Sequence, residues 1–258
     1  MNIATNIATN IAEQQQIEAE QLRTDLVCAY HVLDLEGQGS GLGGHVTARV
    51  AGEEAFWSHP FGLAFEEVTA ADLIKLDFKL NKLEGNGRVN PTLIFHSCIY
   101  QARPEVNCVV HTHADHVTAL TATGAPLELV TQLTSILLDD TASLDEDEGL
   151  VVDEGGGDDL ARALGVRRAL LLKNHGLISV GPSIAAAVTG AIILEYAAMM
   201  QLKVMAAGSV SALPRAAAAE AKRFLTTGAN TQDRWAMLKR RAARARPAFI
   251  PAAAAHSN

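Results

Sequence analysis

VNCVVHTHADH, residues 106–116, is the stretch that decides how this chain folds and what it can hold. Its first half is apolar and β-branched, which is typical of a buried strand. Two histidines follow where that strand should end. Side chains at positions i and i+2 of a strand point to the same face, so His111 and His113 should lie side by side. Two imidazoles on one face can share a metal ion.

A second apolar strand is predicted at residues 168–172, and it leads into LLKNHGL at 171–177. His175 lies just beyond this strand and is followed by Gly176, which lets the backbone turn sharply and approach a site closely. Three neutral imidazoles would leave a divalent ion open positions for substrate, as catalytic metal sites require. Spacing alone leaves the alternative that these histidines are unrelated surface or core residues.

Helices and short strands alternate around these segments. Asn90 and Pro91 predict the start of a helix, because asparagine suits the N-cap and proline the first helical position. The other predicted helices are 17–37, the residues after the histidines up to 120, and 158–164, 184–207, 214–226 and 231–245. The other predicted strands are 46–50, 55–58, 73–78 and 177–180. This alternation is typical of a layered α/β domain.

The chain organisation predicts one domain at residues 17–246, between a flexible tail at 1–16 and a second tail at 247–258. The chain has 258 residues, which is enough for one well-packed core. Cys28, Cys98 and Cys108 are sparse and lie among apolar residues, so they should be buried free thiols.

Charge and hydropathy exclude several classes of partner. The formal net charge is -8 and the cations are scattered, so no nucleic-acid partner is expected. There is no run of about 18 apolar residues and no secretory signal, so we expect no membrane partner and a cytoplasmic location.

Several motifs, taken in order, resemble the class II aldolase/adducin family over most of the chain. They are GLGGHVTARV at 41–50, HPFGLAFEEVTAADL at 59–73, the segment from NPTLIFHSCIY to HTHADH at 90–116, and LLKNHGLISVGPSIAAAV at 171–188. The resemblance implies a single three-layer α/β/α domain with a central, mainly antiparallel sheet. It also implies a homotetramer with active sites at subunit interfaces. One divalent metal ion per subunit would bind His111, His113 and His175, with Mn²⁺ or Zn²⁺ as first candidates and Mg²⁺ or Fe²⁺ as alternatives.

The chain departs from the sugar-phosphate aldolases of that family at two places. They carry an acidic residue at the start of the helix before the metal strand, where this chain has Thr92. They bind phosphate through small hydroxyl residues and an asparagine, where this chain has Asn90, Pro91 and His45. Proline has no N–H to donate. Sugar-phosphate chemistry is therefore not expected.

The resemblance then favours members that decarboxylate hydroxylated aromatic or heteroaromatic dicarboxylates, since losing carbon dioxide needs an electron sink but no base. His45 and His116 are candidate proton donors, because imidazole titrates near neutrality. Arg88 is a candidate to bind a second carboxylate of the small-molecule substrate. Asn90, Thr92 and Gly44 are further candidate substrate contacts.

Three alternatives stay open at this point. One is a metal-dependent aldolase for an unphosphorylated hydroxy-keto acid, and another is a non-haem iron oxygenase on the same histidines. The third is an adducin-like scaffold without a metal. His96 is expected to be a core histidine bonded to backbone, and Trp57 and Phe61 to be apolar wall or core residues.

Overall fold

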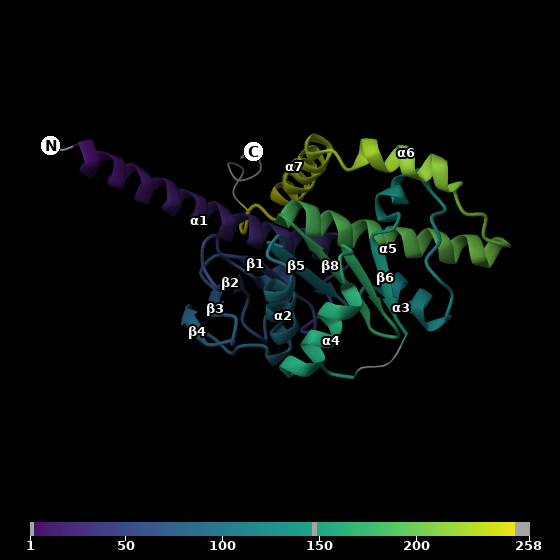
Figure 1. Cartoon of the computed structure of the whole chain (residues 1–258), viewed down its shortest axis with the longest axis horizontal. Helices are drawn as coiled ribbons and strands as arrows, with labels where there is room; N and C mark the ends of the chain where they lie inside the picture. The colour runs from purple at the N-terminus through teal and green to yellow at the C-terminus, as the bar shows by residue number, and fades with distance from the viewer. Residues whose placement is uncertain (1–2, 146–148, 251–258) are drawn as a thin grey trace.

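Eight strands form one sheet in the order β4-β3-β2-β1-β5-β8-β7-β6, as the computed structural model of residues 3–145 and 149–250 shows (Figure 1). All neighbouring strands pair antiparallel except β6 and β7, so the predicted mainly antiparallel sheet is confirmed. The strands are β1 (His45–Arg49), β2 (Ala55–Ser58), β3 (Ile74–Asp77), β4 (Lys82–Glu84), β5 (Cys108–Thr112), β6 (Thr141–Leu144), β7 (Ala169–Leu172) and β8 (Gly176–Gly181).

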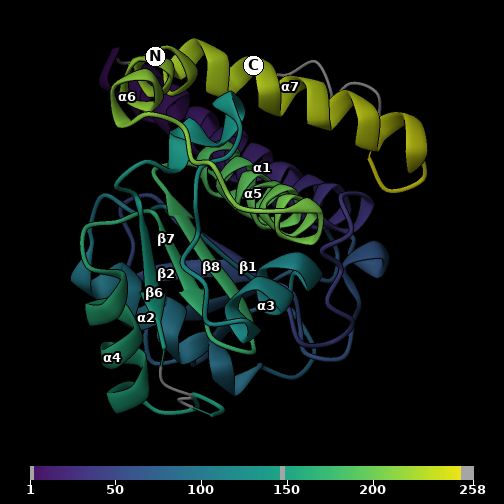
Figure 2. The same ribbon diagram turned by 90° about the vertical axis from the view of Figure 1, so that its right-hand side faces the viewer.

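Helices cover both faces of this sheet (Figures 1 and 2). They are α1 (Ile3–Leu35), α2 (Ile94–Ala102), α3 (Asp115–Ala122), α4 (Glu154–Leu164), α5 (Ile184–Ala207), α6 (Arg215–Leu225) and α7 (Gly228–Ala245), with short 3-10 turns η1 (Phe65–Glu67), η2 (Pro91–Leu93) and η3 (Gln132–Leu137).

Alternation along β5 divides the core into two layers. Cys108 and Val110 pack into one cluster with residues of α1, α5 and α7. Val109 points to the opposite face and packs with α2 and α4. Successive strand side chains point to opposite faces, and both faces of β5 are therefore apolar. The three-layer α/β/α domain expected from the resemblance is confirmed.

The helix α5 is long enough and apolar enough on average to cross a membrane, although it contains no uninterrupted run of about 18 apolar residues. Its N-terminus is capped by the Ser183 side chain, which accepts from the Ala186 N–H. Because 61% of its most apolar window is buried inside the molecule, α5 acts as the core helix of the fold. A helix surrounded by protein is apolar on most sides.

The structure differs from the predicted elements at the ends and at the sheet edges. Helix α1 begins at Ile3, so the segment expected to be a flexible tail is helical, with a hydrogen bond between Gln14 and Glu18 one turn apart. Strands β4 and β6 were not predicted, because each is short and lacks an alternating apolar pattern. Ile250 is buried, while residues 251–258 lie outside the described part of the chain. The domain boundaries stay predictions.

The three cysteines, Cys28, Cys98 and Cys108, are buried and free, as expected.

Candidate metal centre

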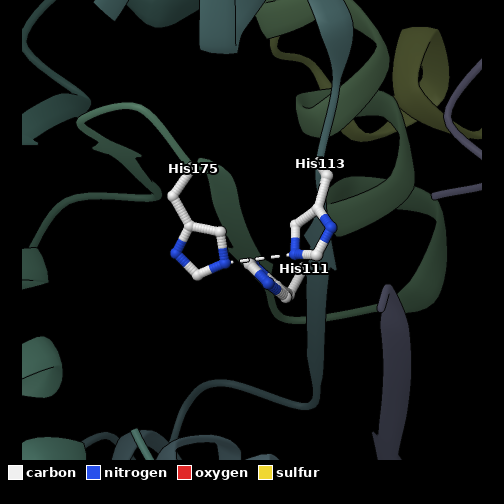
Figure 3. A group of neighbouring side chains, drawn as sticks. All are labelled: His111, His113 and His175. Carbon is white, nitrogen blue, oxygen red and sulfur yellow. Dashed lines mark hydrogen bonds between the residues drawn. The ribbon is translucent and has the colours of Figure 1, made fainter. Parts of the chain in front are cut away.

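The pairing of β5 with β8 brings together three histidines that lie up to 64 positions apart, from His111 to His175. His111 lies in β5 opposite Ile178 of β8, and His113 and His175 lie just outside the adjoining ends of the two strands. One ring nitrogen from each histidine lies within 4.8 Å of the others. Figure 3 shows the three rings facing one another. The pairing of β5 with β8 thus places the third imidazole beside the first two.

The ring nitrogens are arranged to hold a cation. His111 donates through Nδ1 to the Leu177 carbonyl at 2.9 Å. In the neutral ring, Nε2 is then unprotonated and its lone pair can bind a metal. The Nε2 atoms of His113 and His175 are 3.1 Å apart. Two nitrogens that each lie about 2.1 Å from one ion are roughly 3 to 3.4 Å apart, so this spacing fits a shared divalent metal.

Burial favours the neutral, metal-binding form of the His111 and His113 imidazoles. Desolvation, followed by the proximity of His175 and His113, lowers the pKa of His111 well below its usual value. Desolvation and the nearby His175 also lower the pKa of His113. Metal ligands must be deprotonated, so the site is prepared to bind near neutral pH.

Two glycines allow the close approach of the loops that carry the histidines. A Cβ atom on Gly176 would lie 2.2 Å from the Thr112 carbonyl oxygen and 3.0 Å from the His113 Cα. A Cβ atom on Gly43 would lie 2.4 Å from the His113 Cε1. A larger residue would have to displace the loop backbone at Gly176, and the His113 ring at Gly43.

The histidines lie at the wall of a cavity of about 440 Å³. Arg88 and Lys173 also line it, and none of its described lining residues is acidic. The Arg88 guanidinium lies over the Phe61 ring, 4.9 Å from its centroid, which places a cation beside an aromatic wall. The apolar lining consists of Leu42, Phe61, Val89, Phe95, Leu144, Leu150, Val151, Leu160 and Leu172.

Most of the predicted site residues meet in this cavity. His45, Arg88, Asn90 and Thr92 line it together with the three histidines. Gly44 does not line it: a Cβ there would lie 2.9 Å from both the Phe65 ring and the Ser40 Cβ, so Gly44 serves packing. Its neighbour Gly43 lines the cavity instead.

His116 is separated from the cavity. The chain enters α3 directly after the metal strand, which turns His116 toward α5. Its Nδ1 lies 2.5 Å from the Glu195 carboxylate, and the same carboxylate accepts from the N–H groups of His116 and Val117. His116 lines a second cavity of about 900 Å³, beside α5 and α7. The proposed proton donor therefore does not face the metal cavity within this chain.

A buried hydrogen-bonded chain lies behind His45. Its Nε2 is 2.9 Å from the Thr92 hydroxyl, and its Nδ1 is 2.7 Å from the Nε2 of His96. His96 continues to the Thr47 hydroxyl at 2.8 Å, and Thr47 to the Tyr100 hydroxyl at 2.7 Å. Burial lowers the pKa of His96 to about 3 and that of His45 well below its usual value. His96 is buried in the core, as expected, but the expectation that it bonds backbone was wrong, because both ring nitrogens bond side chains.

The sequence contains a signal for this chain. Residues 45 and 47 share one face of β1, and residues 96 and 100 share one face of α2, so polar partners recur at the strand and helix periods. Lys173 was missed because a lysine beside a strand end is ordinarily solvated. Trp57 is not in the cavity lining and packs in the core, whereas Phe61 lines the cavity.

The fold and the site define an α/β/α protein with three histidines that could bind a metal ion at one end of its central strands. These histidines border a mostly apolar cavity that also contains Arg88 and Lys173. The chain belongs to the family described as Class II Aldolase and Adducin N-terminal domain, whose model matches residues 24–202. The family resemblance found in the sequence is confirmed.

Individual relatives span several activities. Decarboxylase NovR of Streptomyces niveus is 33% identical over 73% of this chain and 71% of its own length. Alpha-adducin of Mus musculus is 36% identical over 63% of this chain and 23% of its own length. The solved structure of L-fuculose 1-phosphate aldolase from Glaciozyma antarctica PI12 has a TM-score of 0.82 and 30% identity, and the match covers 91% of this chain and 94% of that one.

Proposed function

We propose that this protein is a divalent-metal-dependent carbon–carbon lyase that decarboxylates a hydroxylated aromatic or heteroaromatic dicarboxylate. The observation that carries the proposal is one cavity that combines three facing imidazoles, two cations and apolar walls. A planar, doubly anionic substrate matches each of these features. Similarity to Decarboxylase NovR supports the same reaction class.

The chain's own residues would bind and orient such a substrate. Arg88 offers a planar guanidinium that can hold a carboxylate through two hydrogen bonds, and Lys173 adds a second positive charge. The rings of Phe61 and Phe95 and the surrounding aliphatic side chains would cover the faces of an aromatic ring and exclude water. A carboxylate held between cations and the histidine centre is fixed in one orientation.

Carbon–carbon cleavage by decarboxylation fits the polar groups present. The bond to the carboxylate carbon breaks, carbon dioxide leaves, and its electron pair stays on the substrate. A divalent ion on the three histidines would act as a Lewis acid that stabilises the negative charge on a neighbouring oxygen. No base is needed at the start, which agrees with Thr92 at the position where the family's sugar-phosphate aldolases carry an acid. Because His45 is bonded at both ring nitrogens and His116 lies outside the cavity, we assign the later proton to water.

The first test is anaerobic turnover of a panel of hydroxylated benzene and pyridine dicarboxylates by protein loaded with Mn²⁺ or Zn²⁺. The proposal predicts release of carbon dioxide without oxygen uptake. Oxygen consumption would indicate an iron oxygenase, and release of an aldehyde from a hydroxy-keto acid would indicate an aldolase. Protein that retains no metal under any of these conditions would contradict every enzymatic candidate and favour an adducin-like role.

Three finer expectations stay predictions. They are the choice of Mn²⁺ or Zn²⁺ over Mg²⁺ or Fe²⁺, the homotetramer with interface active sites, and the cytoplasmic location.

A further inference from the structure

A line of buried polar side chains ends at Asn90 on the cavity wall. We propose that its hydrogen bonds run in one direction only, so that the Asn90 amide is held with its NH₂ group donating into the cavity, and that His96 is a positioning residue that acts through His45 and keeps the Thr92 hydroxyl donating to this amide. The site would then demand a hydrogen-bond acceptor on the substrate at that point.

The orientation is set at the cavity end of the line. The Asn90 Oδ1 accepts from the Thr92 backbone N–H at 3.1 Å and from the Thr92 hydroxyl at 2.8 Å. A backbone N–H can only donate, so the amide oxygen must face the start of η2. The amide nitrogen has no hydrogen-bond partner in the described part of the chain, although Asn90 is only 6% exposed and lines the cavity. Because Asn90 lines the cavity, this NH₂ group can donate to an acceptor on a bound ligand.

The orientation of the Asn90 amide also fixes which ring nitrogens of His45 and His96 carry a hydrogen. The Thr92 hydroxyl has one hydrogen, which is engaged by Asn90, so its oxygen must accept from the Nε2–H of His45. One ring hydrogen on each histidine satisfies every contact in the line, and neither ring is hydrogen-bonded to a carboxylate that would hold a second hydrogen. The Nδ1 of His45 is then bare and accepts from the Nε2–H of His96.

The inner end of the line agrees with the same direction. The Nδ1 of His96 is bare and accepts from the Thr47 hydroxyl, whose oxygen in turn accepts from the Tyr100 hydroxyl. Each hydroxyl and each neutral ring has a single hydrogen to donate, and because the Asn90 amide oxygen can only accept, only this assignment places one hydrogen in every contact. Reversing any one bond would leave two donors or two acceptors facing each other, at a cost of about 1–3 kcal/mol.

The substrate consequence rests on the proposed function. An NH₂ donor fixed on the wall pairs with a carboxylate or a carbonyl oxygen and rejects a group that can only donate. In a dicarboxylate, Asn90 would bind an oxygen of the substrate beside the Arg88 and Lys173 cations. Loss of a hydrogen bond to a charged oxygen should weaken binding about tenfold.

The experiment measures the protonated ring nitrogens of His45 and His96 by ¹⁵N NMR in Zn²⁺-loaded protein. We expect both rings to be neutral with the hydrogen on Nε2. The same protein is then titrated with phthalate, beside His96→Gln, whose side-chain NH₂ can replace the Nε2–H donor, and His96→Phe, which cannot donate. We expect phthalate affinity to fall about tenfold in His96→Phe and to stay within about threefold of wild type in His96→Gln.

A hydrogen on Nδ1 of His45 would overturn the proposal, and so would unchanged phthalate affinity in a folded His96→Phe protein. If His96→Phe does not fold, the wild-type spectrum still decides the direction. Wild-type protein that shows the expected ring protons and yet does not bind phthalate would support the hydrogen-bond direction and contradict the proposed dicarboxylate substrate.

Discussion

Replacing Gly43 by alanine tests the metal centre with one added carbon atom. The backbone at Gly43 is not left-handed, so alanine fits the chain and the strain comes from the side chain alone. Its Cβ would lie 2.4 Å from the His113 Cε1 and 2.8 Å from its Nδ1. Ordinary contact begins at 3.4 Å, so the ring must move by about 1.0 Å, the difference between 3.4 and 2.4 Å.

That displacement exceeds what a metal site tolerates. Ligand distances vary by about 0.2 Å in working sites, so His113 should cease to be an effective ligand. We expect metal affinity to fall about 100-fold, which corresponds to ~2.7 kcal/mol. The fold should survive, because the far end of a side chain can swing aside more easily than backbone.

The assay is a Zn²⁺ competition titration of Gly43→Ala against a chelating dye, with thermal unfolding of the metal-free protein measured in parallel. Gly228→Ala is the matched control, because a Cβ at Gly228 meets nothing within 4 Å and the residue lies in α7, away from the site. Zinc affinity of Gly43→Ala within twofold of wild type would refute the assignment of His113 as a ligand. A large loss of metal-free stability would refute the claim that the effect is local.

Three further predictions follow from the same geometry. His113→Ala should abolish stoichiometric metal retention after dialysis, as metal analysis would show; a metal-loaded variant would contradict the ligand set. Arg88→Ala and Lys173→Ala should each raise KM for a dicarboxylate about tenfold while leaving kcat within a few fold, since both residues bind and neither reacts. Stability should fall on acidification, because burial lowers the pKa of His96 to about 3 and that of His59 to about 4. The unfolded chain takes up these protons below about pH 6.5 and the native chain does not, so lowering the pH from 7 to 5 should cost roughly 2 kcal/mol for each ring. Urea unfolding at the two pH values measures this loss, and a flat profile would contradict it.

Local sequence determined the elements that carry the site. The apolar pattern predicts the strand β5, which contains His111 and ends one residue before His113, and Asn90 with Pro91 starts the helical turn η2. These features depend on neighbouring residues only, through the strand period and the capping preferences of the backbone. The ordered motifs also identified the family, which the match over residues 24–202 confirms.

Tertiary packing decided which of the candidate residues line the cavity. His45 and His116 carry the same chemistry, yet pairing of β1 with β5 puts His45 at the cavity, whereas the start of α3 turns His116 toward Glu195. Lys173 becomes a cavity residue only because β8 lies beside the metal strand β5 and β7 lies beside β8.

The sequence by itself thus determined which residue types lie at each strand end, and it predicted His111, His113 and His175 as one group of metal ligands. Only the tertiary structure showed that the three histidine rings lie together, that Gly43 and not Gly44 lines the cavity, and that Asn90 lies at the end of a buried line of hydrogen bonds. The physical reason is distance along the chain: strand pairing and core packing bring together residues whose separation no local periodicity encodes.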